Sequence, residues 1–184
     1  GSDDEFERFN GPPLTIVVTE LQRVHSLPGS YDQLLRTYLS MVEDAYLDLP
    51  PNPGAIELLR LAHDLGIPVG VVTSNGSNLT RTWLGSVGLD SLVDIIIGGD
   101  NVKRGKPDPE PYLKALDQTG CIALKSLAVE DSIAGARSAV AAGIPTLLLN
   151  GSPLAITLEA TVIDHLDRVA EVLAGRNIIT GERR

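Results

Sequence analysis

Residues 127–143 read LAVEDSIAGARSAVAAG, and this stretch decides the class of fold. It opens with a short apolar run, Leu127 to Val129, which predicts a buried strand. Two carboxylates, Glu130 and Asp131, follow the run and precede Ser132. After Ser132 the apolar residues recur at the spacing of one helix face: Ile133, Ala136, Val140 and Ala141. The stretch therefore predicts a strand, a pair of carboxylates and a helix in direct succession.

Two interpretations of the carboxylate pair are open at this point. Asp and Ser are good N-caps, and acidic side chains are favoured near a helix N-terminus, so helix capping alone explains the pair. A strand that ends in two acids also places them at the carboxyl edge of a sheet, where open α/β folds bind their ligands. Two other polar stretches of the chain favour the second interpretation.

The composition limits the class of protein. With 184 residues and 43% hydrophobic content, the chain can form one domain with a sizeable core, or such a domain with a small appendage. A net charge of −9 and a pI near 4.7 argue against nucleic acid or an anionic membrane as partner, and no apolar run reaches the length of a membrane span. Cys121 is the single cysteine, which excludes an intrachain disulfide and favours a reducing, cytoplasmic location.

The first part of the chain predicts two helices joined by a short turn. Apolar residues recur at helical spacing over residues 14–25 and again over residues 31–47. The segment that follows, residues 49–54 (LPPNPG), is a stiff linker because three of its six residues are prolines. We therefore expect a helical hairpin domain over residues 3–49 and a second domain over residues 50–184.

Helices and strands alternate through the second domain. Short runs of β-branched and aliphatic residues predict the strands, and the segments between them have helical periodicity. We expect strands over residues 67–73, 93–97, 127–129 and 145–149, and helices over residues 55–65, 77–87, 110–119, 132–142 and 164–173. Strands separated by helices in this way form a parallel sheet that is covered on both faces. The predicted fold class is α/β, a doubly wound parallel sheet with a helical segment at its N-terminal side.

The first supporting stretch is TSNGS, residues 73–77, which follows a predicted strand and opens a predicted helix. The Ser74 hydroxyl, the Asn75 side chain and the backbone N–H groups of a helix N-terminus together suit a phosphate group. The alternative is an ordinary turn, since Ser, Asn and Gly are common turn residues.

The second supporting stretch is KRGKPDP, residues 103–109. Pro107 and Pro109 stiffen the chain around Lys106, and Pro109 suits the first turn of the helix that follows. A rigidly presented ammonium group can hold a phosphoryl oxygen or a carboxylate. The alternative is a solvated basic turn in which Lys106 has no function.

The order of these three stretches resembles the haloacid dehalogenase-like superfamily, and within it the branch of capped phosphatases and β-phosphoglucomutase-like enzymes. The resemblance implies that the Ser74 hydroxyl binds the transferring phosphoryl group, with Asn75 beside it. It implies that Lys106 neutralises the charge of phosphate and nucleophile. It also implies that Asp131 binds Mg²⁺, with Glu130 supporting the metal shell, and that the helical hairpin is part of the cap.

One motif of the superfamily has no counterpart in this sequence. The resemblance implies an Asp-x-Asp pair after a first strand, with its first Asp as nucleophile and its second as acid/base, but no such pair follows a predicted strand here. We therefore expect a chain that begins inside the cap, and a core over residues 50–184 that lacks the strand between those ending at Thr73 and Val129. Either another segment or a second chain supplies a strand there, or the two flanking strands close together.

The resemblance implies a Mg²⁺-dependent phosphatase that acts on a small phosphorylated metabolite, such as a sugar phosphate. Without the nucleophilic Asp, we expect the chain by itself to be inactive. A sugar-phosphate mutase of the same branch is the nearest enzymatic alternative. An alternative of another class is a non-catalytic module that binds phosphate.

Overall fold

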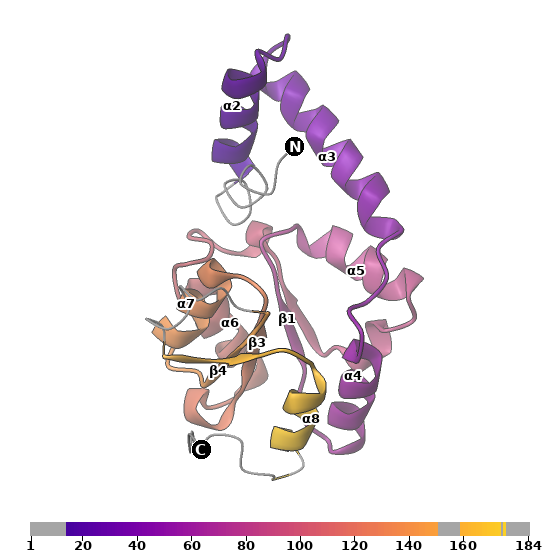
Figure 1. The fold of residues 1–184 in the computed structure, drawn as a ribbon, viewed down its shortest axis with the longest axis vertical. Helices are drawn as coiled ribbons and strands as arrows, with labels where there is room; N and C mark the ends of the chain where they lie inside the picture. Colours follow the sequence, from indigo (N-terminus) through magenta and orange to yellow (C-terminus); the bar gives the residue numbers. More distant parts are fainter. Residues whose placement is uncertain (1–13, 151–158, 174, 176–184) are drawn as a thin grey trace. The chain divides into compact units, whose positions relative to one another are not determined.

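The computed structural model describes residues 14–150, 159–173 and 175. The chain divides into two compact units, Gly1–Pro50 and Pro51–Arg184, which are described separately (Figure 1). Among the helices of the described part, none has both the length and the apolar character needed to cross a membrane.

The first unit contains the two predicted helices, α2 (Leu14–His25) and α3 (Tyr31–Leu47), which pack against each other. Ser30 precedes α3 and forms a capping box with Gln33. The Ser30 side chain accepts a hydrogen bond from the Gln33 N–H, and the Gln33 side chain accepts one from the Ser30 N–H at 2.9 Å. Both predictions of helix are confirmed. At the start of α3, the cap satisfies backbone donors that a helix start leaves without partners.

The second unit alternates helices and strands as predicted. Its helices are α4 (Ala55–Asp64), α5 (Ser77–Ser86), α6 (Glu110–Thr119), α7 (Ile133–Ala141) and α8 (Asp167–Leu173). Its strands are β1 (Gly70–Val72), β2 (Ile95–Ile97), β3 (Ala128–Glu130), β4 (Thr146–Leu149) and β5 (Ala160–Ile163). Three short 3₁₀ turns, η1 (Asp90–Leu92), η2 (Gly99–Asn101) and η3 (Ala123–Lys125), complete the described elements.

The strands differ from the prediction at several of their ends and by one additional strand. The strands expected over 67–73 and 93–97 are shorter, and the strand expected to end at Val129 includes Glu130. Residues 160–163 form a strand that was not predicted, although ATVI is rich in β-branched residues. The differing ends have a common reason. A strand ends where its neighbour stops pairing with it, as in the register of Glu130 with Leu148, and periodicity along the chain does not report on the neighbour.

Helices cover both faces of the strands, which confirms the doubly wound α/β class. Adjacent residues of β4 point to opposite faces, as in any strand. Leu147 packs in a cluster with residues of α4 and α8, whereas Leu148 packs with Ala136 and Ile133 of α7 (Figure 1). The unit therefore has a core on each side of its strands.

The parallel strands form two sheets among the described residues, with orders β1-β2 and β3-β4-β5. Thr73 N–H donates to the Ile97 carbonyl, so the backbone groups of Val72, one residue earlier, point away from β2. Ala128 N–H donates to the Pro145 carbonyl, so those of Val129 point away from β4. Direct pairing of β1 with β3, one of the two expected outcomes, is not found. In the described part, β1 and β3 each keep one edge without a strand partner.

We predict that the centre of β4 carries a large share of the stability of the second unit. Leu148 is 1% exposed, so Leu148→Ala should lower the free energy of unfolding by about 2–5 kcal/mol, measured by urea denaturation. The matched control is Leu124→Ala, at a side chain that is 81% exposed, which should change it by no more than about 0.5 kcal/mol. Equal effects of the two variants would contradict a core organised around β4.

Candidate phosphate and metal site

Lys106 lies where the carboxyl ends of the two sheets come together. Its ammonium group donates a hydrogen bond to the carbonyl oxygen of Val72, the last residue of β1, at 3.0 Å. It also forms an ion pair with the Glu130 carboxylate, at the end of β3. The Lys106 side chain is only 9% exposed. The cation is thus held inside the protein between two strand ends.

Glu130 receives two donors on one oxygen. Lys106 Nζ and the Tyr112 hydroxyl both donate to Glu130 Oε1, and the Lys106 ammonium lies 5.5 Å from the centroid of the Tyr112 ring. Burial, together with the nearby Glu130 carboxylate, raises the pKa of Tyr112 above its ordinary value, so its hydroxyl stays protonated and can donate. A buried carboxylate is tolerated when it has such partners.

Glycine at position 135 makes room for this carboxylate. A Cβ atom added to Gly135, in the first turn of α7, would overlap the carboxylate group of Glu130. Glu130 shares a face of β3 with Ala128, whose cluster includes Tyr112 of α6. The carboxylate therefore points inward, against both α6 and α7.

Asp131, in contrast, is exposed. The cap of α7 is provided by Ser132, whose hydroxyl accepts a hydrogen bond from the Gly135 N–H at 3.1 Å. Among the described residues, none hydrogen-bonds to the Asp131 carboxylate or forms an ion pair with it. Helix capping is thus the role of Ser132 and not of the acidic pair. The Asp131 carboxylate remains available.

The two carboxylates supply oxygen donors of the kind that Mg²⁺ prefers. In the part of the chain that the structure describes, no group of three or more His, Cys, Asp or Glu side chains could hold a metal ion. Mg²⁺ commonly binds proteins through one or two carboxylates and takes its other ligands from water or substrate. Asp131 and Glu130 fit such a partial site, and they do not fit zinc, which takes histidine or cysteine ligands in most sites.

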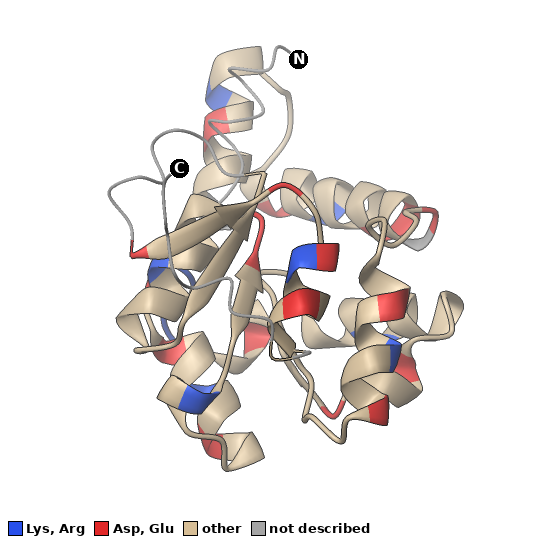
Figure 2. Ribbon diagram, turned by 60° about the horizontal axis from the view of Figure 1, so that its bottom comes forward, with Lys and Arg blue, Asp and Glu red and all other residues tan. Residues whose placement is uncertain are grey.

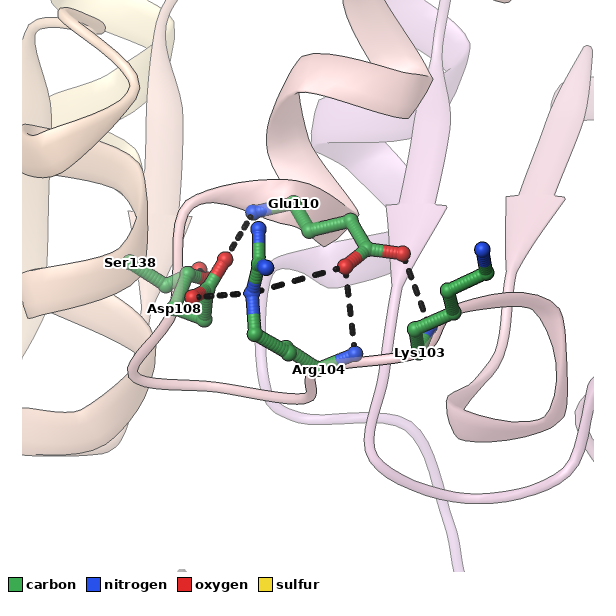
Figure 3. Close-up of polar contacts among 5 residues, drawn as sticks. All are labelled: Lys103, Arg104, Asp108, Glu110 and Ser138. Carbon is green, nitrogen blue, oxygen red and sulfur yellow. Dashed lines mark hydrogen bonds and ion pairs between the residues drawn. The ribbon is translucent and has the colours of Figure 1, made fainter.

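The loop that carries Lys106 is braced by hydrogen bonds (Figure 3). The Glu110 carboxylate, in the first turn of α6, accepts from Lys103 N–H at 2.7 Å and Arg104 N–H at 3.1 Å. The Arg104 guanidinium pairs with Asp108 at 2.7 Å, and the Ser138 hydroxyl of α7 donates to the Asp108 carbonyl at 2.5 Å. Contacts to α6 and α7 thus add to the stiffness expected from the prolines.

Ser74 and Asn75 follow β1 in a loop that contacts the loop after β2. Ser74 is exposed, and Asn75 N–H donates to the Thr73 hydroxyl at 3.1 Å. The Asn75 carbonyl accepts from the Gly99 N–H at 2.9 Å. Because Lys106 contacts Val72, two residues before Ser74, both lie at the carboxyl end of β1.

The Asp100 carboxylate, which was not predicted as a site residue, binds the first residue of α5. Asp100 of η2 accepts hydrogen bonds from the Ser77 N–H at 2.9 Å and the Ser77 hydroxyl at 2.8 Å. The bond from the Ser77 N–H, with the bond from its hydroxyl, lowers the pKa of Asp100 below its ordinary value, so this carboxylate is charged at neutral pH. The N–H of Ser77, one of the donors expected to face phosphate, is therefore already engaged.

Three residues of this site were not predicted: Tyr112, Gly135 and Asp100. Tyr112 lies six residues after Lys106, in the first turn of α6, but its sequence position gives no indication that the hydroxyl reaches Glu130. Gly135 has a sequence signal, since a glycine in the first turn of an otherwise apolar helix suggests a close approach. Asp100 also has a sequence signal, because it follows a predicted strand after two glycines, Gly98 and Gly99.

Comparison with known proteins places the chain in a family. The profile of the family described as haloacid dehalogenase-like hydrolase matches residues 1–149. The validoxylamine A 7'-phosphate phosphatase of Streptomyces hygroscopicus subsp. limoneus is 38% identical over 106 residues, which are 54% of this chain and 50% of that protein. The phosphorylated carbohydrates phosphatase of Thermotoga maritima is 35% identical over 96 residues, 52% of this chain and 44% of the relative. This chain thus spans about half the length of these relatives.

A solved structure is similar to this chain over almost its whole length. It is that of a candidate β-phosphoglucomutase from Thermotoga maritima, 25% identical, with a TM-score of 0.77 over 95% of this chain and 84% of that one. The resemblance drawn from Ser74, Lys106 and Asp131 is confirmed at the level of the family. Since the family profile matches well over half of its residues, this chain belongs to the haloacid dehalogenase-like hydrolases.

Proposed function

We propose that this chain carries the phosphate-binding and Mg²⁺-binding parts of a phosphatase site for a small phosphorylated metabolite, such as a sugar phosphate. The observation that supports this most is the position of Lys106, a buried cation held between the ends of β1 and β3. Two of the relatives are named as a validoxylamine A 7'-phosphate phosphatase and a phosphorylated carbohydrates phosphatase, which supports a phosphorylated small molecule as substrate.

Lys106 would supply the positive charge that a phosphoryl group requires. Phosphoryl transfer needs neutralisation of the charge on three equatorial oxygens. The chain as a whole is strongly acidic, with 24 Asp and Glu against 15 Lys and Arg, and Figure 2 shows acidic residues spread over the helices and loops. An anion therefore needs a local cation, and Lys106 beside the donors of Ser74 and Asn75 would provide that environment.

Asp131 and Glu130 would hold the metal ion. Asp131 is exposed and uncommitted among the described residues, so we assign it the direct contact. Glu130 is bound to Lys106 and Tyr112, so we assign it a supporting role. When bound, Mg²⁺ would neutralise charge that develops on the phosphoryl oxygens.

Among the residues that the structure describes, we do not find a nucleophile. Glu130 is engaged by two donors, and Asp131 belongs to the proposed metal site, so neither is assigned attack on phosphorus. The open edges of β1 and β3 offer unpaired backbone groups for an additional strand. A segment or second chain that pairs there would bring its carboxyl end beside Lys106.

We propose a phosphatase rather than a mutase, because the named curated relatives are phosphatases. These two phosphatases are 38% identical over 106 residues and 35% identical over 96 residues, and the mutase-like structure is 25% identical over 95% of this chain. A purely phosphate-binding module would share Lys106 and Ser74 but would gain no turnover when a strand with a nucleophilic Asp is supplied.

We predict that phosphate binding depends on Lys106. Lys106→Ala should weaken the dissociation constant for inorganic phosphate at least about tenfold, measured by calorimetry, because a charge-assisted hydrogen bond is lost. Lys125→Ala, which removes an exposed lysine of η3, should leave binding unchanged. Lys106→Ala also leaves Glu130 buried without its cation and should lower the free energy of unfolding by about 3–5 kcal/mol, so circular dichroism must first show that the variant is folded. Equal phosphate affinity in wild type and folded Lys106→Ala would refute the site.

We predict that Mg²⁺ binding depends on Asp131. Asp131→Asn should abolish the binding heat of Mg²⁺, because the amide removes the charge of the exposed ligand. The matched control is Asp117→Asn on the exposed side of α6, which should retain the wild-type heat. Loss of binding in the control, or its retention in Asp131→Asn, would contradict the assignment.

We predict that the 184-residue chain alone does not turn over a generic aryl phosphate in the presence of Mg²⁺. The reason is the lack of an assigned nucleophile, since the remaining groups only stabilise charge around an attack. A steady-state assay of the purified chain tests this. Metal-dependent multiple turnover that disappears in Lys106→Ala would show that a residue of this chain acts as nucleophile after all.

A further inference from the structure

We infer that Asp100 is a positioning residue for the phosphate-binding loop, residues 74–77. This inference rests on the proposed function, because it concerns the same loop. Asp100 would act through Ser77 and would not touch the phosphate itself.

The contact of Asp100 with the loop is double. Its two carboxylate oxygens accept separate hydrogen bonds, one from the Ser77 N–H at 2.9 Å and one from the Ser77 hydroxyl at 2.8 Å. Two bonds from one carboxylate to one residue fix the orientation of that residue as well as its distance. Ser77 is the first residue of α5, so the contact sets where the helix begins relative to Ser74 and Asn75.

The two loops approach so closely that only glycine fits between them. A Cβ atom on Gly99 would lie 2.5 Å from the Ser74 carbonyl oxygen, and one on Gly98 would lie 2.9 Å from the Asn75 carbonyl oxygen. Gly99 N–H donates to that Asn75 oxygen at 2.9 Å. Three residues of the phosphate-binding loop are thus in contact with η2 or the glycine before it.

The loop of Asp100 is itself anchored on its other side. The Asn101 side chain accepts from the Gly98 N–H at 2.9 Å, which closes the turn. The Lys114 ammonium of α6 donates to the Asn101 carbonyl at 2.6 Å. Because α6 directly follows the loop of Lys106, the contacts of Asp100 link the phosphate-binding loop to the helix that braces Lys106.

The charge and the geometry of Asp100 have opposite effects on an anion. A carboxylate near the loop repels phosphate, so its removal would tighten binding if repulsion were its main effect. Its hydrogen bonds hold the loop in shape, so their removal would weaken binding if positioning dominates. An Asn side chain separates the two effects, because it carries no charge. Its oxygen can accept from the Ser77 N–H, as in an N-cap, and its NH₂ group can donate to the Ser77 hydroxyl oxygen.

The experiment compares Asp100→Ala, Asp100→Asn and the control Asp90→Ala, at an exposed aspartate of η1. The first measurement is the dissociation constant of inorganic phosphate by calorimetry. Asp100→Ala should weaken it about tenfold, which corresponds to the loss of one or two hydrogen bonds, whereas Asp100→Asn and Asp90→Ala should bind at least as tightly as wild type. The second measurement is amide hydrogen exchange, which needs no ligand: Ser77 and Gly99 should exchange faster in Asp100→Ala alone.

The results distinguish the inference about Asp100 from the proposed function. Unchanged or tighter phosphate binding in Asp100→Ala overturns the inference, as does Asp100→Asn that binds as weakly as Asp100→Ala. Unchanged exchange at Ser77 and Gly99 in Asp100→Ala also overturns it. A wild-type chain that binds no phosphate overturns the proposed function, and faster exchange in Asp100→Ala then still supports the structural link from Asp100 to the loop.

Discussion

The ion pair between Lys106 and Glu130 is the interaction on which the arrangement of the site depends. The pair connects the ends of two strands. Glu130 is the last residue of β3, and Lys106 donates a hydrogen bond to the carbonyl group of the last residue of β1. Both side chains are almost fully buried, so the cost of removing two charges from water must be offset by their mutual attraction and by further hydrogen bonds. The Val72 carbonyl and the Tyr112 hydroxyl supply those bonds.

This interaction also explains why a glycine and a tyrosine lie beside the Glu130 carboxylate. Glu130 can turn inward only because Gly135 has no side chain, and its charge remains compatible with burial because two donors meet one oxygen. Asp131, one residue later, is exposed. Two chemically similar acids in succession are thus a buried partner of lysine and an accessible carboxylate.

The candidate site lies at the ends of the two strands, β1 and β3, whose edges have no strand partner in the described part. Backbone groups at the edges of β1 and β3 have no strand partner in the described part of the chain, and Lys106 satisfies one of them, the Val72 carbonyl. The carboxyl ends of both sheets therefore meet at a lysine. Open α/β folds bind their ligands at this end of the sheet, and Ser74, Asp100 and Asp131 follow β1, β2 and β3 there.

The amino-acid sequence by itself determined the class of the fold, most element positions and the family. Hydrophobic periodicity is local, so the helices over 14–25, 31–47 and 110–119 could be predicted from it, and Ser74, Lys106 and Asp131 stood out by their positions after predicted strands. Only the tertiary structure decided the division into two sheets, the strand at 160–163 and the opposite roles of Glu130 and Asp131. The same holds for the contacts of Tyr112 and Asp100, whose partners are 18 and 23 residues away. The physical reason is that hydrogen bonds between distant segments depend on how the elements pack, which the local spacing of residue types does not contain.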